Sequence, residues 1–464
     1  MPNAVNHAHA LSYATARGPG RCQSLDHAGA DPHENTFHMT GWSARLGTPE
    51  RSRPHTRPRW QLPHVSAHAR LGGRSLASPV VGSGVRTLMY VRKRVLEWRE
   101  VGDPVLEADT DALVRPFAVA RCDLDNAFLR HDLGTPIRIG HGVGLLDRRL
   151  LHDLGPRPFT GPFPFGHECV AEVVRIGAAV GSVAPGDVVV VPFQISCGRC
   201  ASCGRGLTAA CTTDRRTAIS MYSLGEASGG WGGVLSDLLR VPHADHMLLQ
   251  VPAGVDPVAL ASASDNIPDG WRAVAGSLAR NPEAPVLVLG GRAESVGLYA
   301  AASAVALGAV QVDYLDTSTE RLDIAATLGA RPLRRRRGRR SWPARERPGT
   351  RYPIVVDASG ERGALEHAMR SLTAGGVCTS VTPYFTAGTR LPLWTMYVQQ
   401  ASLVTGLTNA RAELPAVLNA VSACRLRPEL VTGLLADWDD APTALLAPTA
   451  KVVVARARVT DGQR

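Results

Sequence analysis

Four cysteines gather in the stretch CGRCASCGRGLTAAC, and their spacing is that of a metal site. Cys197, Cys200, Cys203 and Cys211 are separated by two, two and seven residues. Structural zinc binds four thiolates tetrahedrally and leaves no position open for a substrate. A four-iron cluster usually ends with a three-residue gap and a proline, and neither is present here. The stretch predicts a closed zinc lobe, four unligated loop thiols being the alternative, and any chemistry must then come from elsewhere.

A second metal site can be assembled from residues that lie far apart in the chain. A catalytic zinc needs three protein ligands and one exchangeable position. Cys122 stands in VARCDLD at the end of a strand pattern, and His167 stands in FGHECVAEVVRIG just before one. Asp265 stands in ASASDNIPDGW, before an apolar helix start. Taken singly, each is weak, because a lone cysteine is usually part of a core and a lone histidine beside glycine is usually structural.

The stretch VLVLGGRAESVGLYA predicts a site for the phosphates of a dinucleotide. It supplies a strand, a glycine-containing turn and a helix start, whose N–H groups can hold a pyrophosphate. The pattern is degenerate, because Arg292 and Glu294 stand where glycines are commoner. Arg292 could pair with phosphate, whereas Glu294 would repel it unless turned away. The residues expected to contact the coenzyme here are Gly290, Gly291, Arg292, Ser295, Val296 and Gly297.

The next strand, VQVDYLD, ends at Asp316, five residues before Arg321, and both are expected at the coenzyme. An acidic residue at this place hydrogen-bonds the adenosine ribose and repels a 2′-phosphate. Asp313 is the nearby alternative, but it lies inside the strand. Asp316 therefore favours NAD over NADP.

Regular apolar patterning begins at Met89, and the kind of secondary structure that it predicts changes at residue 255 and again at residue 401. Residues 1–88 lack apolar periodicity and contain eight of the fifteen histidines, so we expect them to be disordered or to be an extension upstream of the true start. Residues 89–254 read as strands punctuated by Pro and Gly, whereas residues 255–400 alternate strands with helices, which predicts a parallel sheet. Residues 401–464 form a third, short block.

The net charge of +10 comes from two basic blocks. Residues 1–88 hold ten Arg against four acids and residues 331–351 hold ten against one, so the remainder is mildly acidic. The Arg run at 333–349 is most simply a solvated loop, with an anion-binding patch as the alternative. Arg199, Arg205, Arg215 and Arg216 lie near the cysteine cluster, but the residues between them lack the aromatic side chains of a stacking platform, which disfavours binding to nucleic acid. No apolar run approaches the roughly 18 residues of a membrane span or forms a secretory signal, which favours the cytoplasm.

The order of these motifs resembles the zinc-containing medium-chain alcohol dehydrogenases over residues 89–464. GHE, then GDVVVVP, the four-cysteine lobe, GGWGGVLSDLLRVP and the strand–helix region follow one another as in that family. RCDLD and SDNIPDGW look most like the branch of the glutathione-independent formaldehyde dehydrogenases. The resemblance implies an α/β fold in which a GroES-like, mostly β catalytic domain (89–254 and 401–464) surrounds a doubly wound Rossmann domain (255–400).

The resemblance also implies the site. Cys122, His167 and Asp265 would bind a catalytic zinc, with Glu168 and Asp125 as carboxylates behind the ligands. Hydride would pass between a zinc-bound alkoxide and NAD, with two zinc ions per chain and a homodimer or homotetramer as the assembly. An alcohol or aldehyde would be the substrate.

The chain departs from the family pattern at the positions that usually relay the alcohol proton. Leu124 stands where Ser or Thr is usual, and Ala127 where a His is often found. The 44 residues between Cys122 and His167 are more than most members have, and this insertion is expected to shape the substrate pocket. A decayed or repurposed copy of the fold is therefore the main alternative to an active enzyme, and a zinc-containing nucleic-acid-binding protein is the lesser one.

Overall fold

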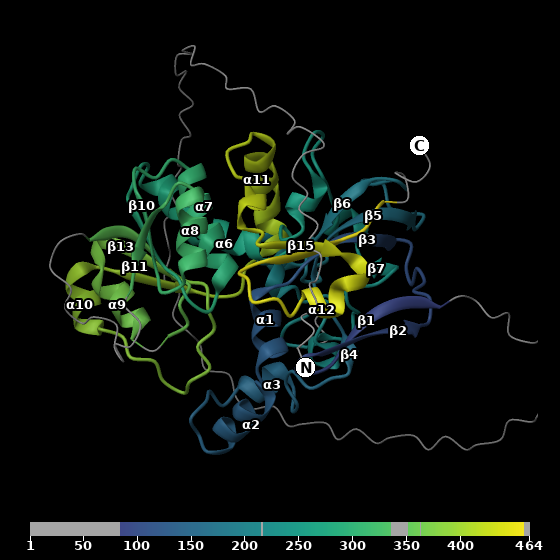
Figure 1. Cartoon of the computed structure of the whole chain (residues 1–464), viewed down its shortest axis with the longest axis horizontal. Helices are drawn as coiled ribbons and strands as arrows, with labels where there is room; N and C mark the ends of the chain where they lie inside the picture. The colour runs from purple at the N-terminus through teal and green to yellow at the C-terminus, as the bar shows by residue number, and fades with distance from the viewer. Residues whose placement is uncertain (1–83, 215–216, 336–350, 362, 459–464) are drawn as a thin grey trace, which may run out of the picture. The chain divides into compact units, whose positions relative to one another are not determined.

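Two sheets organise the part of the chain that the computed structural model describes, which is residues 84–214, 217–335, 351–361 and 363–458 (Figure 1). The first sheet has seven strands in the order β15-β16-β3-β5-β6-β8, with β7 paired to β3. Its strands are β3 (Ala112–Ala120), β5 (Glu168–Ile176), β6 (Val188–Val191), β7 (Leu239–Val241), β8 (Leu249–Gln250), β15 (Leu434–Asp437) and β16 (Val452–Ala455). All pairs are antiparallel except β15 with β16.

A three-stranded sheet, in the order β2-β1-β4, packs beside the first one. It consists of β1 (Val85–Arg92), β2 (Val95–Val101) and β4 (Phe163–Pro164). The predicted start of ordered chain at Met89 is wrong, because β1 begins four residues earlier and Leu88 is fully buried. The short strand was hidden by the polar residues Arg86 and Thr87 between its apolar ones. Residues 1–83 of the predicted extension lie outside the described residues.

The parallel sheet has six strands in the order β11-β10-β9-β12-β13-β14, the 3-2-1-4-5-6 order of a doubly wound fold. The strands are β9 (Val286–Leu289), β10 (Val312–Asp316), β11 (Arg331–Arg334), β12 (Tyr352–Asp357), β13 (Leu372–Ser380) and β14 (Ser402–Thr405). Val286 and Val288 pack with residues of α6 (Asn266–Arg280) and α7 (Glu294–Ala306). Leu287 and Leu289 pack with residues of α9 (Ala364–Arg370), so both faces of the sheet are covered.

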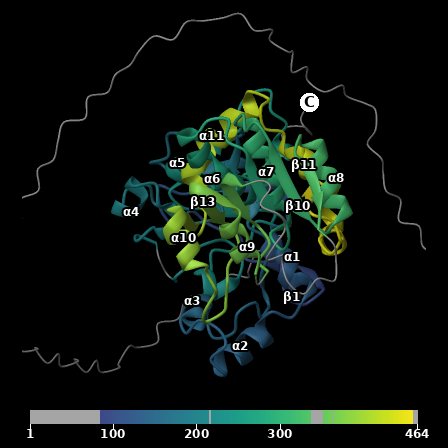
Figure 2. The ribbon, with the colours of Figure 1, turned by 90° about the vertical axis from the view of Figure 1, so that its left-hand side faces the viewer.

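The remaining helices of this layer are α8 (Thr319–Thr327), α10 (Leu393–Gln399) and α11 (Ala410–Ser422), shown from a second side in Figure 2. The predicted return to the first domain at residue 401 comes too early. Strand β14 pairs in parallel with β13, and α11 buries Leu414 and Val417 in the core that α6 and α7 share. The strand–helix alternation therefore continues through Ser422, and only β15 and β16 rejoin the first sheet. The Arg run lies outside the described residues from 336 onward.

The insertion after Cys122 forms α1 (Asp123–Arg130), α2 (Gly134–Gly142) and α3 (Leu150–Leu154), of which α2 lies at the periphery in both views (Figure 1, Figure 2). The loop between α2 and α3 meets a loop of the parallel-sheet layer, since Asp147 N–H donates to Phe385 O at 3.0 Å and Ala387 N–H to Leu145 O at 3.0 Å. The other short helices are α4 (Ala201–Gly204), α5 (Ala244–Met247) and α12 (Ala441–Ala444), with single 3-10 turns at 208–210, 225–228, 257–260, 428–431 and 438–440. Among the described residues, none of these helices is long and apolar enough to span a bilayer.

Candidate metal centres and coenzyme cleft

The fold brings Cys122, His167 and Asp265 together at the junction of the two main sheets. Cys122 precedes α1, His167 precedes β5 and Asp265 precedes α6, so each side chain stands at the end of a regular element. One ligand atom from each lies within 4.8 Å of the others, and all three residues are buried. Three segments that are far apart in sequence thus converge with a sulfur, a nitrogen and an oxygen donor.

The spacing of these three atoms fits one tetrahedral ion. Zinc bonds of about 2.3 Å to sulfur and about 2.0–2.1 Å to nitrogen and oxygen imply S···O near ~3.5 Å and N···O near ~3.4 Å. Cys122 Sγ lies 3.2 Å from Asp265 Oδ2, and His167 Nε2 lies 3.4 Å from the same oxygen. The three predicted ligands therefore fit a zinc ion, and their cavity side offers room for a fourth ligand because all three line the large cavity described below.

Asp125 faces the other nitrogen of the same histidine. Its Oδ1 is 3.6 Å from His167 Nδ1, and neither atom has a hydrogen-bond partner in the described structure. Burial lowers the pKa of His167, but Asp125 and Asp265 outweigh burial and raise it to about 9. The pocket is thus rich in negative charge and favours a cation at its centre. Asp125 is placed to fix the tautomer that leaves Nε2 free for a metal.

Glu168 plays a different part from the one predicted, because it turns away to a buried network. Its Oε2 accepts from Ser262 Oγ at 3.1 Å and from Lys451 Nζ at 3.0 Å, and its Oε1 accepts from Asn266 N–H at 2.9 Å. Burial raises the pKa of Glu168 to about 7, and the Lys451 ammonium limits that rise. Glu168 therefore holds the loop that carries Asp265.

Lys451 is the residue that the sequence patterns did not reveal. It is fully buried, and its Nζ donates to Arg121 O at 2.9 Å and Asn266 Oδ1 at 3.0 Å as well as to Glu168. These three acceptors are the chain neighbours of Cys122, Asp265 and His167, respectively. The available signal was its rarity, since Lys occurs only at positions 93 and 451 and this one precedes the apolar strand VVVA.

The four clustered cysteines also converge. Their sulfur atoms all lie within 4.8 Å of one another, and none forms a disulfide. Four thiolates at about 2.3 Å from one ion would be ~3.8 Å apart, and Cys200 Sγ lies 4.0 Å from Cys211 Sγ. Backbone hydrogen bonds to its sulfur lower the pKa of Cys200 to about 5, which favours the thiolate. The lobe thus fits the predicted structural zinc ion.

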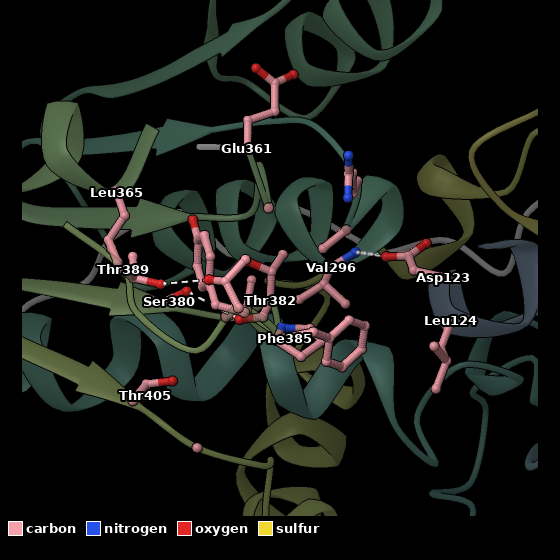
Figure 3. Close-up of a pocket in the computed structure, with 18 of the residues that line it drawn as sticks. Asp123, Leu124, Val296, Glu361, Leu365, Ser380, Thr382, Phe385, Thr389 and Thr405 are labelled. Atoms are coloured by element: carbon pink, nitrogen blue, oxygen red, sulfur yellow. Dashed lines mark hydrogen bonds between the residues drawn. The ribbon is translucent and has the colours of Figure 1, made fainter. Parts of the chain in front are cut away.

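A cavity of about 2200 Å³ joins the Cys–His–Asp centre to the carboxyl ends of the parallel strands. Near the centre its wall is apolar. Phe193 lies 5.6 Å from the ring of His167, centre to centre, and packs with Ile219, Met221 and Leu224. Leu124 and Ala127 line the same cavity, so the positions that usually relay a proton carry no polar side chain here. Figure 3 shows the opposite end, where Ser380, Thr382, Thr389 and Thr405 make the lining polar.

The predicted coenzyme turn lies beside this cavity, but only part of it is exposed to the cavity. Arg292 and Val296 line it. The predicted glycines allow close packing of this turn, since a Cβ at Gly290 would meet the Asp316 carboxylate and one at Gly291 would lie 2.6 Å from Ser359 Cα. The N–H groups of Ser295 and Val296 already donate to the Asp123 carboxylate at 3.0 Å and 3.1 Å.

Asp316 and Arg321 bond to each other and do not line the cavity. Arg321 Nε and Nη2 donate to the two Asp316 oxygens at 2.7 and 2.8 Å, and Asp316 is 2% exposed. Arg321 Nη1 also pairs with Glu294 Oε1 at 3.1 Å. In this structure Asp316 is therefore not available to a ribose, because its charge is already matched, which weakens the predicted repulsion of a 2′-phosphate.

Comparison with known proteins gives the same picture of the fold. Residues 108–253 match the family described as alcohol dehydrogenase GroES-like domain, and residues 295–423 match the one described as zinc-binding dehydrogenase. An Acremonium medium-chain reductase/dehydrogenase is 34% identical over 292 residues, which are 61% of this chain and 88% of the relative. A probable zinc-binding alcohol dehydrogenase of Mycobacterium tuberculosis is 30% identical over 278 residues, 59% of this chain and 67% of that one.

Relatives from the predicted branch match over a shorter stretch. A glutathione-independent formaldehyde dehydrogenase of Pseudomonas aeruginosa is 37% identical over 169 residues, which are 35% of this chain and 41% of that protein. Among solved structures, an alcohol dehydrogenase from Thermus sp. ATN1 superposes with a TM-score of 0.64 at 27% identity, covering 80% of this chain and 99% of that one. With its GroES-like and zinc-binding dehydrogenase regions, the chain belongs to the zinc-containing medium-chain alcohol dehydrogenase family.

Proposed function

We propose that the protein is a zinc-dependent alcohol/aldehyde oxidoreductase that passes hydride between its substrate and NAD. The observation that carries the proposal is the convergence of Cys122, His167 and Asp265 on one cavity that also reaches the β9–α7 turn. Hydride transfer needs an electrophilic centre for the substrate oxygen and an acceptor at the substrate carbon, and this cavity has room for both.

The three ligands would hold the ion, and the residues behind them would set its properties. Bound there, zinc would act as a Lewis acid that lowers the pKa of the alcohol and polarises an aldehyde. Asp125 would keep the proton of His167 on Nδ1, so that Nε2 can bind the ion. Two anionic ligands and one neutral one would balance the charge of Zn²⁺. The hydrogen bond between Glu168 and Lys451 would hold the segments that carry the ligands in a fixed position relative to one another.

The lining of the cavity favours an apolar alcohol or aldehyde of appreciable size. Phe193, Met221, Ile219 and Leu224 form a continuous apolar wall next to His167, and Leu124 extends it. Such a wall gains about 25 cal/mol for each Å² of apolar substrate surface that it buries. Formaldehyde has almost no such surface, so the wall gives it little affinity despite the resemblance to that branch.

The coenzyme is proposed to be NAD, with NADP as the alternative. Arg292 lines the cavity and offers a cation for a phosphate group. Asp316 supports NAD only if its pair with Arg321 opens when the ribose binds, because the paired carboxylate is saturated. Comparing the dissociation constants of NADH and NADPH by nicotinamide fluorescence decides between them.

A repurposed copy of the fold is the second candidate, because the coenzyme side carries internal contacts where phosphates and ribose would bind. The test uses purified protein and the Asp265→Ala variant, with Asp323→Ala as an exposed matched control. We expect two zinc ions per chain in the wild type and the control and about one in Asp265→Ala. Reduction of NAD by a panel of medium-chain and aromatic alcohols should be lost with that zinc. Two zinc ions without turnover or NADH binding would favour the repurposed copy, and one zinc ion in all three proteins would refute the catalytic centre.

We also propose a homo-oligomer in the cytoplasm. Strand β14 is the edge of the parallel sheet, and α10 beside it exposes Trp394 and Tyr397 at 76% and 77%. An open strand edge with an adjacent apolar patch favours pairing with a second copy. Light scattering of the wild type and a Trp394→Glu variant tests the assembly.

A further inference from the structure

The N-terminus of α7 is bonded to a carboxylate of the chain itself. Asp123 Oδ1 accepts from Ser295 Oγ at 2.9 Å, and its oxygens accept from Ser295 N–H at 3.0 Å and Val296 N–H at 3.1 Å. Asp123 belongs to α1, 172 positions away from Ser295 in the chain. Figure 3 shows its side chain directed at Val296 across the cavity wall. A residue adjacent to a candidate zinc ligand thus occupies the donors at the start of the coenzyme-side helix.

These donors are the ones a dinucleotide phosphate would require. The first N–H groups of a helix have no partner within the helix, and the helix dipole adds to their attraction for anions. In α7, which is 13 residues long, the donors of Ser295 and Val296 are satisfied by Asp123. Within the described residues no Lys or Arg forms an ion pair with Asp123, so this helix end supplies the hydrogen-bond donors of its carboxylate, while the Arg121 and Lys451 charges interact with it from farther away.

The contact between Asp123 and the start of α7 is largely shielded from solvent. Asp123 is 9% exposed and Ser295 is fully buried, yet Asp123 and Val296 both line the cavity. A carboxylate and a phosphate cannot share the same donors, and two anions in contact repel each other in a partly buried site. Binding of a phosphate at this helix end therefore requires the Asp123 side chain to leave.

We propose that Asp123 is an internal ligand of the coenzyme phosphate site, which a dinucleotide must displace in order to bind. This inference rests on the proposed function. It assigns Asp123 as a residue that sets coenzyme affinity and links the coenzyme side to α1. Because Asp123 follows Cys122 directly, displacement of the Asp123 side chain would also shift the position of Cys122 at the metal centre.

The expected change in coenzyme affinity depends on the fraction of molecules in which Asp123 does not occupy the N–H groups at the start of α7. An apparent dissociation constant exceeds the intrinsic one by the reciprocal of the competent fraction. If the Asp123 contact leaves the site open in about 1–10% of molecules, its removal tightens binding by about 10- to 100-fold. An Asn at this position keeps the shape and one acceptor but loses the charge, so Asp123→Asn should give part of the gain that Asp123→Ala gives.

The experiment measures two ligands on four proteins: wild type, Asp123→Asn, Asp123→Ala, and Asp132→Asn as a control that removes an exposed carboxylate from the following loop. NADH affinity is read from nicotinamide fluorescence, and inorganic pyrophosphate binding from the rise in melting temperature. Zinc per chain is measured in each protein, so that damage to the neighbouring ligand is detected. If Asp123→Ala loses zinc, Asp123→Asn decides the result.

We expect Asp123→Ala to bind NADH at least tenfold more tightly than the wild type and Asp123→Asn to show part of that gain, and pyrophosphate to stabilise both variants but not the wild type or the control. Affinities of the variants equal to or weaker than those of the wild type would show that Asp123 is only a structural cap and would overturn the inference. If the variants gain pyrophosphate binding while no protein binds NADH, the internal ligand is established and the proposed dinucleotide chemistry fails.

Discussion

Replacing Lys451 by Met tests whether one buried ammonium holds the metal ligands in place. Lys451 is 0% exposed and donates to Arg121 O, Asn266 Oδ1 and Glu168 Oε2. Methionine has a similar length and no charge, so the change leaves the packing volume nearly intact. It removes the only ammonium that faces the Glu168 carboxylate and leaves two further acceptors without a donor.

Breaking a buried ion pair on one side costs about 3–5 kcal/mol, because the remaining charge stays buried without its partner. We therefore expect Lys451→Met to lower the free energy of unfolding by about 3–5 kcal/mol. The variant should also release zinc faster, because the loops of Cys122, His167 and Asp265 lose their common donor. Removing the second charge should reverse part of the loss, so Lys451→Met with Glu168→Gln should recover about 1–3 kcal/mol relative to the single variant.

The measurement is a urea titration followed by fluorescence, together with the rate of zinc transfer to a chelator. Lys93→Met is the matched control, because Lys93 is the other lysine of the chain and is exposed. The reasoning is refuted if Lys451→Met unfolds within about 1 kcal/mol of the control, or if the double variant is less stable than the single one. If the rate of zinc transfer is unchanged while the free energy of unfolding falls, Lys451 stabilises the fold but does not hold the metal ligands in place.

Three further predictions follow from other parts of the structure. Cys203→Ser should lose one zinc ion per chain while Ser202→Ala keeps two, as elemental analysis can show, because the four sulfur atoms converge on one point. Deleting residues 1–88 should lower the stability by about 2–4 kcal/mol relative to deleting residues 1–83, since it also removes half of β1 with the buried Leu88. Burial raises the pKa of Asp237, but hydrogen bonds from Arg456 and Arg86 outweigh it and lower the pKa. The stability that this carboxylate adds, about 1 kcal/mol, is present above its unfolded pKa of about 3.9 and is lost as the pH falls through the lower folded value. The difference in urea midpoint between wild type and Asp237→Asn should therefore shrink below about pH 4, and a constant difference down to pH 3 would contradict it.

The four-cysteine set was predictable from its local spacing, whereas the Cys122, His167 and Asp265 set was implied by the family resemblance. The four cysteines lie within fifteen residues, so their convergence needs only a tight turn. Cys122, His167 and Asp265 are scattered, yet each stands where a strand or helix pattern begins or ends, and such ends meet at the edge of a sheet. The alternation of strands and helices likewise predicted the parallel sheet, whose order agrees with a doubly wound fold.

The partners of those ligands could not be predicted, because they depend on long-range packing. Lys451 reaches the metal centre only because β16 pairs with β3, which brings residue 453 opposite Ala120. Glu168 and Asp125 were both expected behind the ligands; Asp125 faces His167, whereas Glu168 bonds to Lys451 and to the N–H of Asn266, the neighbour of Asp265. The pairing of Asp316 with Arg321 was not foreseen, although an Asp that stands five residues before an Arg at the start of a helix can reach it locally.

The segment RCDLD shows why substitutions at this centre will not be additive. Its five residues, 121–125, face five different structures. The Arg121 guanidinium donates to the carbonyls of the 445–449 loop, Cys122 faces the metal centre, and Asp123 bonds to α7. Leu124 lines the cavity wall, and Asp125 faces His167. A change at any one of them shifts the backbone that positions the other four, so residues in contact through this turn should show coupling energies of about 0.5–3 kcal/mol. Coenzyme affinity and zinc affinity are therefore expected to change together when the turn is altered. If an Asp123 variant changes coenzyme affinity and leaves zinc affinity as it is, the effect belongs to the Asp123 side chain and is not transmitted through the backbone of the turn.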